Sequence, residues 1–194
     1  RRRHTRYISV TGIQTCALPI SLVAHWVLGL SWISSGLVGA AVAPTDPAVM
    51  FSVLGNREIE GRTGTILQGE SGANDPVGIA LMIGMLELAT HPGSSFWVVV
   101  TTFALQMAVG LAIGVAGGVL LGVTMRRGSL PSAGLYSLRT LAAAGVIYGV
   151  ASVAHGSGFL AVFIAGLLVG DVRAPFKDEI ETFHEALSSL AEFV

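Results

Sequence analysis

Three carboxylates stand inside apolar stretches of this 194-residue sequence, where a charged group is costly and needs a reason. Counted inward from the polar segment 55–62, Asp46 and Glu70 lie roughly 12 Å along their helices and Asp75 roughly 18–20 Å. Because the hydrocarbon core of a membrane is about 30 Å thick, all three are expected near its middle. Three acids at one depth, on adjacent antiparallel helices, predict a site for a cation.

The segment Ala43-Pro44-Thr45-Asp46-Pro47 is expected to break its helix at this depth. Its two prolines remove two amide donors and disfavour helical geometry at the preceding residues, Ala43 and Asp46. Carbonyl groups left unpaired inside a membrane are tolerated only where they line a polar cavity, and half-helix ends would complement an ion there. A simple proline kink is the alternative, but it does not explain why Thr45 and Asp46 lie inside the kink.

Oxygen-bearing side chains recur at helical spacing in the second stretch, Gln68–Val77. Glu70 and Asn74 share one helix face, and Ser71 and Asp75 share the next. The Asn74 carbonyl and the Asp75 carboxylate are hard oxygen ligands, which suit hard cations. A carboxylate in a half-dry cavity can hold a proton or a cation near neutral pH, but not both, and such a group is a minimal exchanger.

The composition agrees with a chain that crosses a membrane several times. Hydrophobic residues make up 52% of the sequence and charged residues 12%, about half of the roughly 25% usual in soluble domains. With a mean hydropathy of +0.71, too little polar surface is present to cover a soluble globule. A net charge of -1 and one cysteine exclude a basic nucleic-acid binder and a disulfide scaffold. We expect an all-α, polytopic helical bundle in a lipid bilayer.

Short polar loops divide the sequence into apolar segments, and each segment predicts a helix. The expected helices are a partial one at 21–30, a span at 36–54, a span at 63–88 interrupted by Gly69, Gly72 and Pro76, a long tilted helix at 96–125, a regular one at 134–154, a short one at 158–169, and a further span beginning at 179. Lysine and arginine occur in alternate loops. The positive-inside rule therefore puts loops 55–62, 126–133 and 171–178 in the cytoplasm of a multi-pass cell-membrane protein.

Glycine recurs every fourth residue in the long segment, at Gly110, Gly114, Gly118 and Gly122. Such a ridge lets a second helix approach closely. Packing within one protomer is favoured over a dimer seam as its role.

Residues 1–20 differ from the rest of the chain in being basic and polar. A signal peptide fits poorly, because Thr11, Gln14 and Thr15 interrupt the stretch where it needs a continuous apolar run. A translated DNA sequencing adaptor joined to the coding frame fits better, with a true cytoplasmic arm as the alternative. We therefore divide the chain into a non-native extension, 1–20, and a transmembrane part, 21–194.

The two motifs 43–47 and 69–76, Ala-Pro-Thr-Asp-Pro and Gly-Glu-Ser-Gly-Ala-Asn-Asp-Pro, resemble those of the sodium or potassium/proton antiporters in the cation:proton antiporter superfamily. The stretch 156–170 looks like a later helix of that family. The resemblance covers 21–194 and implies part of an inverted-repeat fold with discontinuous helices, whose core domain moves against a dimerisation domain. It implies exchange of Na⁺ or K⁺ for H⁺ by alternating access, without a cofactor, in a homodimeric full-length parent.

The resemblance also implies roles for individual residues. Asp75 is the carboxylate that binds cation and proton in turn, and a monovalent cation would contact Asp75 and Thr45 transiently. Asp46 and Thr45 lie at the unwound crossing, Ser71 contributes an oxygen, and Asn74 stands where electrogenic relatives carry a second Asp.

Glu70 matches a family glutamate that pairs with an arginine from a second half of the protein. Family members have about twice as many spans as this chain, so that partner and the second repeat are missing. The chain is therefore expected to be a fragment.

Three other functions compete with antiport. A cation channel could use the same acids, but the sequence has no filter-like repeat around a symmetric pore. A non-transporting membrane fragment is the second. A membrane-embedded enzyme would rest only on Asp46 and Asp75 resembling an aspartyl dyad, since HExxH, GxSxG and paired-histidine motifs do not occur. We do not expect an enzyme.

Overall fold

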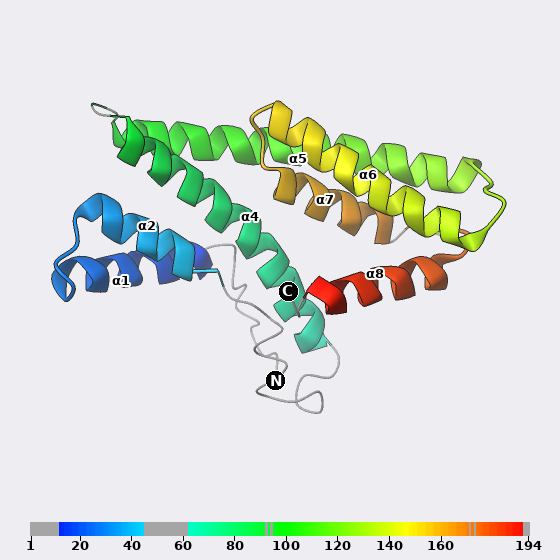
Figure 1. Cartoon of the computed structure of the whole chain (residues 1–194), viewed down its shortest axis with the longest axis horizontal. Helices are drawn as coiled ribbons and strands as arrows, with labels where there is room; N and C mark the ends of the chain where they lie inside the picture. The colour runs from blue at the N-terminus through cyan, green and yellow to red at the C-terminus, as the bar shows by residue number, and fades with distance from the viewer. Residues whose placement is uncertain are drawn as a thin grey trace, which may run out of the picture. The chain divides into compact units, whose positions relative to one another are not determined.

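The computed structural model describes residues 12–44, 62–91, 93, 95–170, 172 and 174–191. Within these ranges the regular structure is entirely helical, which confirms the predicted all-α class (Figure 1). The helices are α1 Gly12–Trp26, α2 Trp32–Val42, α4 Arg62–Thr90, α5 Phe96–Arg127, α6 Ala133–Val153, α7 Gly158–Gly170 and α8 Lys177–Ala191.

Two of these helices, α5 and α6, are long and apolar enough to cross a membrane by length and composition. They have 32 and 21 residues, against the roughly 20 that a crossing requires. The segments Cys16–Trp26, Trp32–Val42 and Gly158–Gly170 are apolar but shorter.

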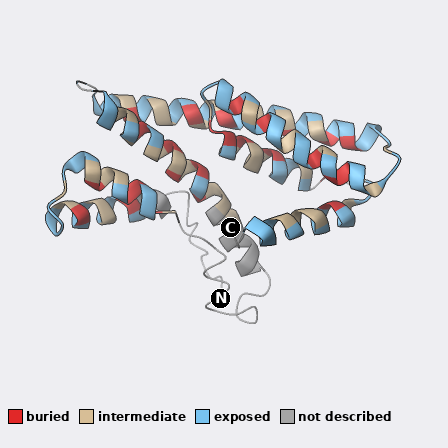
Figure 2. Ribbon diagram, viewed as in Figure 1, coloured by how far each residue is buried: buried red, intermediate tan, exposed pale blue. Residues whose placement is uncertain are grey.

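Much of α5 and α6 is exposed, as the pale blue segments of these helices show (Figure 2), and the exposed residues include many large apolar ones. Leu120 is 66% exposed and Val153 is 83% exposed. Water would disfavour this much exposed apolar surface, whereas a hydrocarbon phase would not. The surface of these helices is therefore suited to contact lipid.

The chain forms two compact units, residues 1–107 and 108–194, and α5 continues from the first into the second. In the first unit α2 packs between α1 and α4. Gly39 of α2 faces Ser21 and the Ala17 carbonyl so closely that a side chain there would collide with both. Gly84 of α4 lies against Val99 of α5, where a Cβ would be 3.1 Å from Val99 Cγ1.

In the second unit, the glycine ridge of α5 packs against α7 and the residue just before it. A Cβ on Gly110 would lie 2.7 Å from the Ser157 carbonyl oxygen, and one on Gly114 would lie 2.7 Å from that of Ala161. Gly118 meets Ala165 in the same way. The packing of this ridge within one protomer agrees with the interpretation favoured from the sequence.

The end of α5 and the start of α6 are joined by side-chain contacts. Tyr136 is 2% exposed, and its hydroxyl accepts a hydrogen bond of 2.9 Å from the Leu130 amide. Arg139 Nη1 donates to the carbonyls of Thr124 and Gly128 at the end of α5, at 3.2 and 3.3 Å. The Thr124 carbonyl also accepts from the Gly128 amide at 2.9 Å, so the Arg139 side chain adds a charged donor at the C-terminal end of α5.

Several expected element boundaries and interruptions differ from the structure. The first helix begins at Gly12 rather than at 21, so residues 12–20 are continuous with it. The second runs from Trp32 to Val42, and residues 45–54 of the expected span 36–54 lie outside the described residues. Ala43 keeps helical dihedrals, with φ -68° and ψ -34°, although Pro44 follows. Its amide is held by the Gly39 carbonyl, which outweighs the steric preference, so the predicted departure from helical geometry at Ala43 is wrong.

The predicted interruption of the 63–88 span is also wrong, because α4 is one continuous helix with Pro76 inside it. A proline removes one amide donor, whereas a break would release several backbone groups, and this cost is higher in an apolar environment. α8 begins at Lys177 and is amphipathic rather than uniformly apolar, so the expected span beginning at 179 is not confirmed within the described residues.

Candidate functional site

Asn74 and Asp75 are consecutive residues of α4, so their side chains leave the helix about 100° apart. Asn74 is 8% exposed and therefore faces the inside of the first unit, whereas Asp75 is exposed. The next residue, Pro76, is fully buried. α4 thus holds a buried amide and an accessible carboxylate side by side on a rigid element.

The end of α2 lies one helical turn from this pair. A Cβ built on Gly78 of α4 would be 2.6 Å from Pro44 Cγ and 3.7 Å from the Ala40 carbonyl oxygen. Gly36 near the other end of α2 faces Met85 of α4. α2 and α4 therefore run antiparallel, and α2 ends at the level where α4 presents Asp75.

An apolar cluster holds this arrangement in place. Ala17 of α1 and Ala43 at the end of α2 are buried together, and Val77 and Leu81 of α4 pack against them. The small residues at this crossing let three helices approach closely. The carboxylate-bearing turn of α4 is thereby fixed relative to α1 and α2.

The remaining predicted site residues are only partly covered by the structure. Thr45 and Asp46 lie outside the described residues. Ser71 and Glu70 belong to α4, but their side chains are not among those described. The part of the chain that is described contains no group of three or more His, Cys, Asp or Glu residues able to hold a metal ion.

A polar contact in the first unit joins α4 to α5. Thr102 Oγ1 donates a hydrogen bond of 2.9 Å to Glu87 Oε2. Gln106, one turn further along the same face of α5, is 7% exposed. This contact could not be predicted from the sequence, because nothing in the spacing of the residues indicates which face of α5 meets α4.

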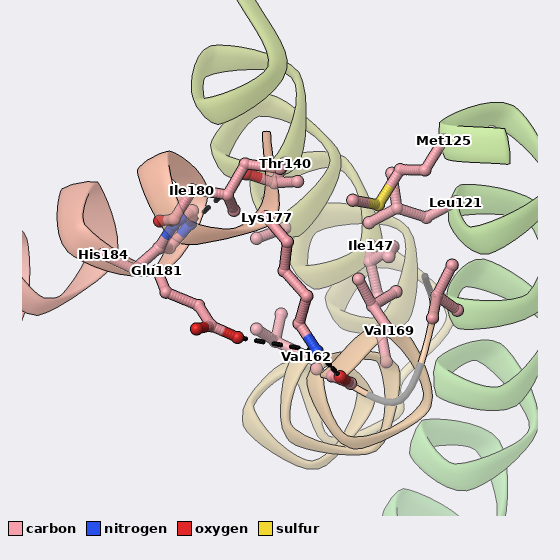
Figure 3. Close-up of a pocket in the computed structure, with 15 residues that line it drawn as sticks. Leu121, Met125, Thr140, Ile147, Val162, Val169, Lys177, Ile180, Glu181 and His184 are labelled. Atoms are coloured by element: carbon pink, nitrogen blue, oxygen red, sulfur yellow. Dashed lines mark hydrogen bonds and ion pairs between the residues drawn. The ribbon is translucent and has the colours of Figure 1, made fainter. Parts of the chain in front are cut away.

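The second unit contains a cavity of about 260 Å³ between α5, α6, α7 and α8 (Figure 3). Its walls are mostly apolar, formed by Leu121, Met125, Ala144, Ile147, Val162, Ala165, Val169 and Val172. The polar side chains that line it are Thr140, Lys177, Glu181 and His184. None of the predicted cation-site residues lines this cavity, which was not foreseen from the sequence.

Two polar contacts on α8 border the cavity. Lys177 Nζ donates a short hydrogen bond to the Gly170 carbonyl oxygen at the end of α7, and it lies 3.6 Å from Glu181 Oε1. Since Lys177 and Glu181 are both substantially exposed, this ion pair contributes little to stability.

The sequence matches the family of transmembrane sodium/hydrogen exchangers over residues 2–194. The chain belongs to this family. This match confirms the resemblance to monovalent cation:proton antiporters that the sequence motifs indicated. The family is one of membrane transporters rather than enzymes.

Curated relatives of this exchanger chain carry antiporter names. It is 32% identical over 189 residues to the K(+)/H(+) antiporter NhaP of Alkalimonas amylolytica, covering 96% of this chain and 33% of the relative. It is 31% identical over 170 residues to the K(+)/H(+) antiporter NhaP2 of Shewanella oneidensis, covering 84% and 29%. It is 25% identical over 163 residues to the low-affinity Na(+)/H(+) antiporter NhaS1 of Synechocystis, covering 82% and 30%.

The exchanger chain thus spans about a third of the length of the curated relatives that it matches. No solved structure gives a significant match to it.

Proposed function

We propose that the full-length protein exchanges a monovalent cation, Na⁺ or K⁺, for H⁺ across a cell membrane by alternating access. The observation that carries this proposal is the pair Asn74–Asp75 on α4, one turn from the point where Pro44 ends α2. In a member of an exchanger family, an accessible carboxylate at a helix crossing is suited to bind either a cation or a proton.

The rest of the site follows the sequence. Thr45 and Asp46 come directly after Pro44 in the chain, and we assign them to the same cation site. Ser71 supplies a further oxygen, and Glu70 pairs with a basic group elsewhere in the protein. Carbonyl, hydroxyl and carboxylate oxygens together make a hard donor set, as alkali cations require.

Asp75 is the only group of the Asn74–Asp75 pair that can release a proton. If Asp46 stays ionised throughout the cycle, the binding of one cation displaces one proton. The exchange is then electroneutral. We further propose that loops 55–62, 126–133 and 171–178 lie in the cytoplasm, on the basis of the alternating distribution of basic residues. The resemblance to the antiporter family supports a homodimeric full-length protein.

We propose both K⁺ and Na⁺ as candidate substrates. The relatives named above include K(+)/H(+) antiporters at 31–32% identity and a Na(+)/H(+) antiporter at 25% identity. Transport assays should therefore test both cations side by side.

Asp75→Asn in the full-length protein tests the proposal. Proteoliposomes that carry a pH-sensitive dye should show no cation-driven proton flux above that of empty liposomes, because an amide cannot exchange a proton. Asp178→Asn is the matched control, since Asp178 is an exposed acid on α8, and it should leave the flux unchanged. A wild-type rate in Asp75→Asn would refute the assignment, and single-channel currents in planar bilayers would identify a channel instead.

A further inference from the structure

At the contact between α6 and α8, the hydroxyl of Thr140 meets the imidazole ring of His184. The hydrogen-bond partners of these two side chains indicate where their hydrogen atoms lie. Thr140 Oγ1 lies 2.8 Å from the Ser137 carbonyl oxygen. His184 Nδ1 lies 2.8 Å from the Ile180 carbonyl oxygen. The other ring nitrogen of His184, Nε2, faces Thr140 Oγ1 at 3.5 Å (Figure 3).

Because a carbonyl oxygen can only accept, both short bonds fix where the protons are. The single hydrogen of the Thr140 hydroxyl points to Ser137, and His184 Nδ1 carries a hydrogen that points to Ile180. In a neutral imidazole Nε2 then has no hydrogen. Two acceptors, Nε2 of His184 and Oγ1 of Thr140, face each other at 3.5 Å without a hydrogen between them.

A second proton changes this contact. In the imidazolium form both ring nitrogens are donors, so Nε2 can donate to the lone pairs of Thr140 Oγ1. A hydrogen bond from a charged donor is about twice as strong as one between neutral groups.

Two charged residues line the cavity beside His184, both on its own helix, and the exposed Glu185 directly follows His184 in the chain. Lys177 and Glu181 line the same cavity, and their charges oppose each other across 3.6 Å. The lining residues from α5, α6 and α7 are uncharged, and Thr140 is the polar one among them. Arg139, beside Thr140 in the sequence, has its Nη1 bonded to the end of α5 instead.

Apart from the His184–Thr140 contact, the described contacts of α8 with α5 and α6 include an apolar cluster and one hydrogen bond. Ile180 is buried with Met125 and Tyr136, and Ser137 Oγ donates to the Glu179 carbonyl at 3.5 Å, a long hydrogen bond. Both contacts lie in the first turn of α8. The His184–Thr140 contact is the one described polar link between α6 and the later turns of α8.

We propose that protonation of His184 fastens α8 to α6 by converting its contact with Thr140 from an approach of two acceptors into a charge-assisted hydrogen bond. α8 is therefore held more firmly when the imidazole carries its second proton, so acidification strengthens the α6–α8 contact. The same step fixes the wall of the cavity that α8 provides. This property belongs to the α6–α8 contact and does not depend on the exchange activity.

The first test is the tautomer of His184 in the 194-residue chain, labelled with ¹⁵N-histidine and placed in lipid nanodiscs. At about pH 8.5, where imidazole is neutral, the ¹⁵N shifts should identify hydrogen on Nδ1 and none on Nε2. His184→Gln assigns the resonance. Hydrogen on Nε2 at this pH would overturn the proposal.

The second test is amide hydrogen exchange of residues 177–191 at about pH 8 and 5.5, corrected for the intrinsic pH dependence of exchange. In the wild-type chain, protection should rise about three- to tenfold on acidification, as expected for a single charge-assisted bond. Thr140→Val keeps the shape of the side chain but removes the acceptor, so it should abolish the rise, as should His184→Gln.

Two further variants separate this effect from a folding defect. Thr140→Ser keeps the hydroxyl and should keep the rise. His91→Gln changes an exposed histidine in the first unit and should leave the response of α8 unchanged. A full rise in Thr140→Val, or an equal loss in His91→Gln, would show that another group is responsible.

Discussion

Pro44, at the end of α2, lies directly against Gly78 of α4, within the space that a side chain on Gly78 would occupy. This contact brings Pro44, the last described residue of the first motif, against α4 one turn after Asp75. Its closeness makes it a sensitive place to test whether the site depends on this helix crossing.

Gly78→Ala should destabilise the full-length protein by about 1–3 kcal/mol, because the new methyl group overpacks against the Pro44 ring. Gly69→Ala, in the same helix, is the matched control. A Cβ at Gly69 meets no atom within 4 Å, so alanine there should be neutral or stabilise by about 0.5–1 kcal/mol. Thermal unfolding in detergent compares the two, and equal stability would contradict the close contact.

Gly114→Ala should destabilise the second unit more than Gly145→Ala does. A Cβ on Gly114 would lie 2.7 Å from the carbonyl oxygen and 2.9 Å from the Cα of Ala161, and backbone atoms cannot move aside as a side chain can. Gly145 of α6 has open space at the same position. We expect a difference of about 1–4 kcal/mol in the free energy of unfolding, measured by denaturant titration of the 194-residue chain. Indistinguishable variants would argue against the α5–α7 seam.

Tyr136→Phe should destabilise the chain by about 1–3 kcal/mol, because the Leu130 amide loses its acceptor at a buried position. Tyr148→Phe serves as the control. Tyr148 is 41% exposed and keeps its edge-on contact with Phe159 when the hydroxyl is removed. In thermal melts, Tyr136→Phe should therefore unfold at a lower temperature than Tyr148→Phe. A loss of stability in Tyr148→Phe alone would be incompatible with this account.

Asp46→Ala in the full-length protein should impair transport, and Thr45→Ala should impair it less. A carboxylate at a helix break compensates the partial positive charge of amide ends, whereas a hydroxyl supplies one neutral oxygen. Cation-driven proton flux in proteoliposomes measures both, with Thr101→Ala of α5, an exposed threonine, as the control. Normal transport by both variants would favour a simple proline kink.

Exchange by the full-length protein should be independent of membrane potential. One cation in for one proton out moves no net charge, whereas an electrogenic cycle gains or loses about 2.3 kcal/mol per charge per 100 mV. The rate under a sodium gradient should therefore be the same with the potential clamped by valinomycin and with it collapsed. A several-fold dependence would mean that a second carboxylate titrates besides Asp75.

The positions of three apolar helices could be predicted closely from the sequence. The segments expected at 96–125, 134–154 and 158–169 correspond to α5, α6 and α7 with shifts of two residues or fewer. Each of these apolar segments is flanked by polar residues or glycine, so both of its boundaries can be identified from the sequence. Segments with internal prolines were harder to predict. Pro76 was expected to interrupt α4 and does not, because the local preference of proline competes with the cost of unpaired backbone groups.

The site could be predicted only as a set of residues. The placement of Asn74 and Asp75 on one helix followed from their spacing, but the contact between Pro44 and Gly78 did not. Periodicity identifies the face of a helix and not the partner that packs on it. For the same reason, the contact of His184 with Thr140, 44 residues earlier in the chain, could not be foreseen.

Pro76 has one more consequence for α4. A proline has no amide hydrogen, so the carbonyl oxygen of Gly72, four residues earlier, cannot be satisfied by the helix ladder at residue 76. This oxygen lies within the turn that carries Asn74 and Asp75. A single imino acid thus leaves one carbonyl oxygen of this turn without its amide partner in the helix ladder, while α4 remains one continuous helix.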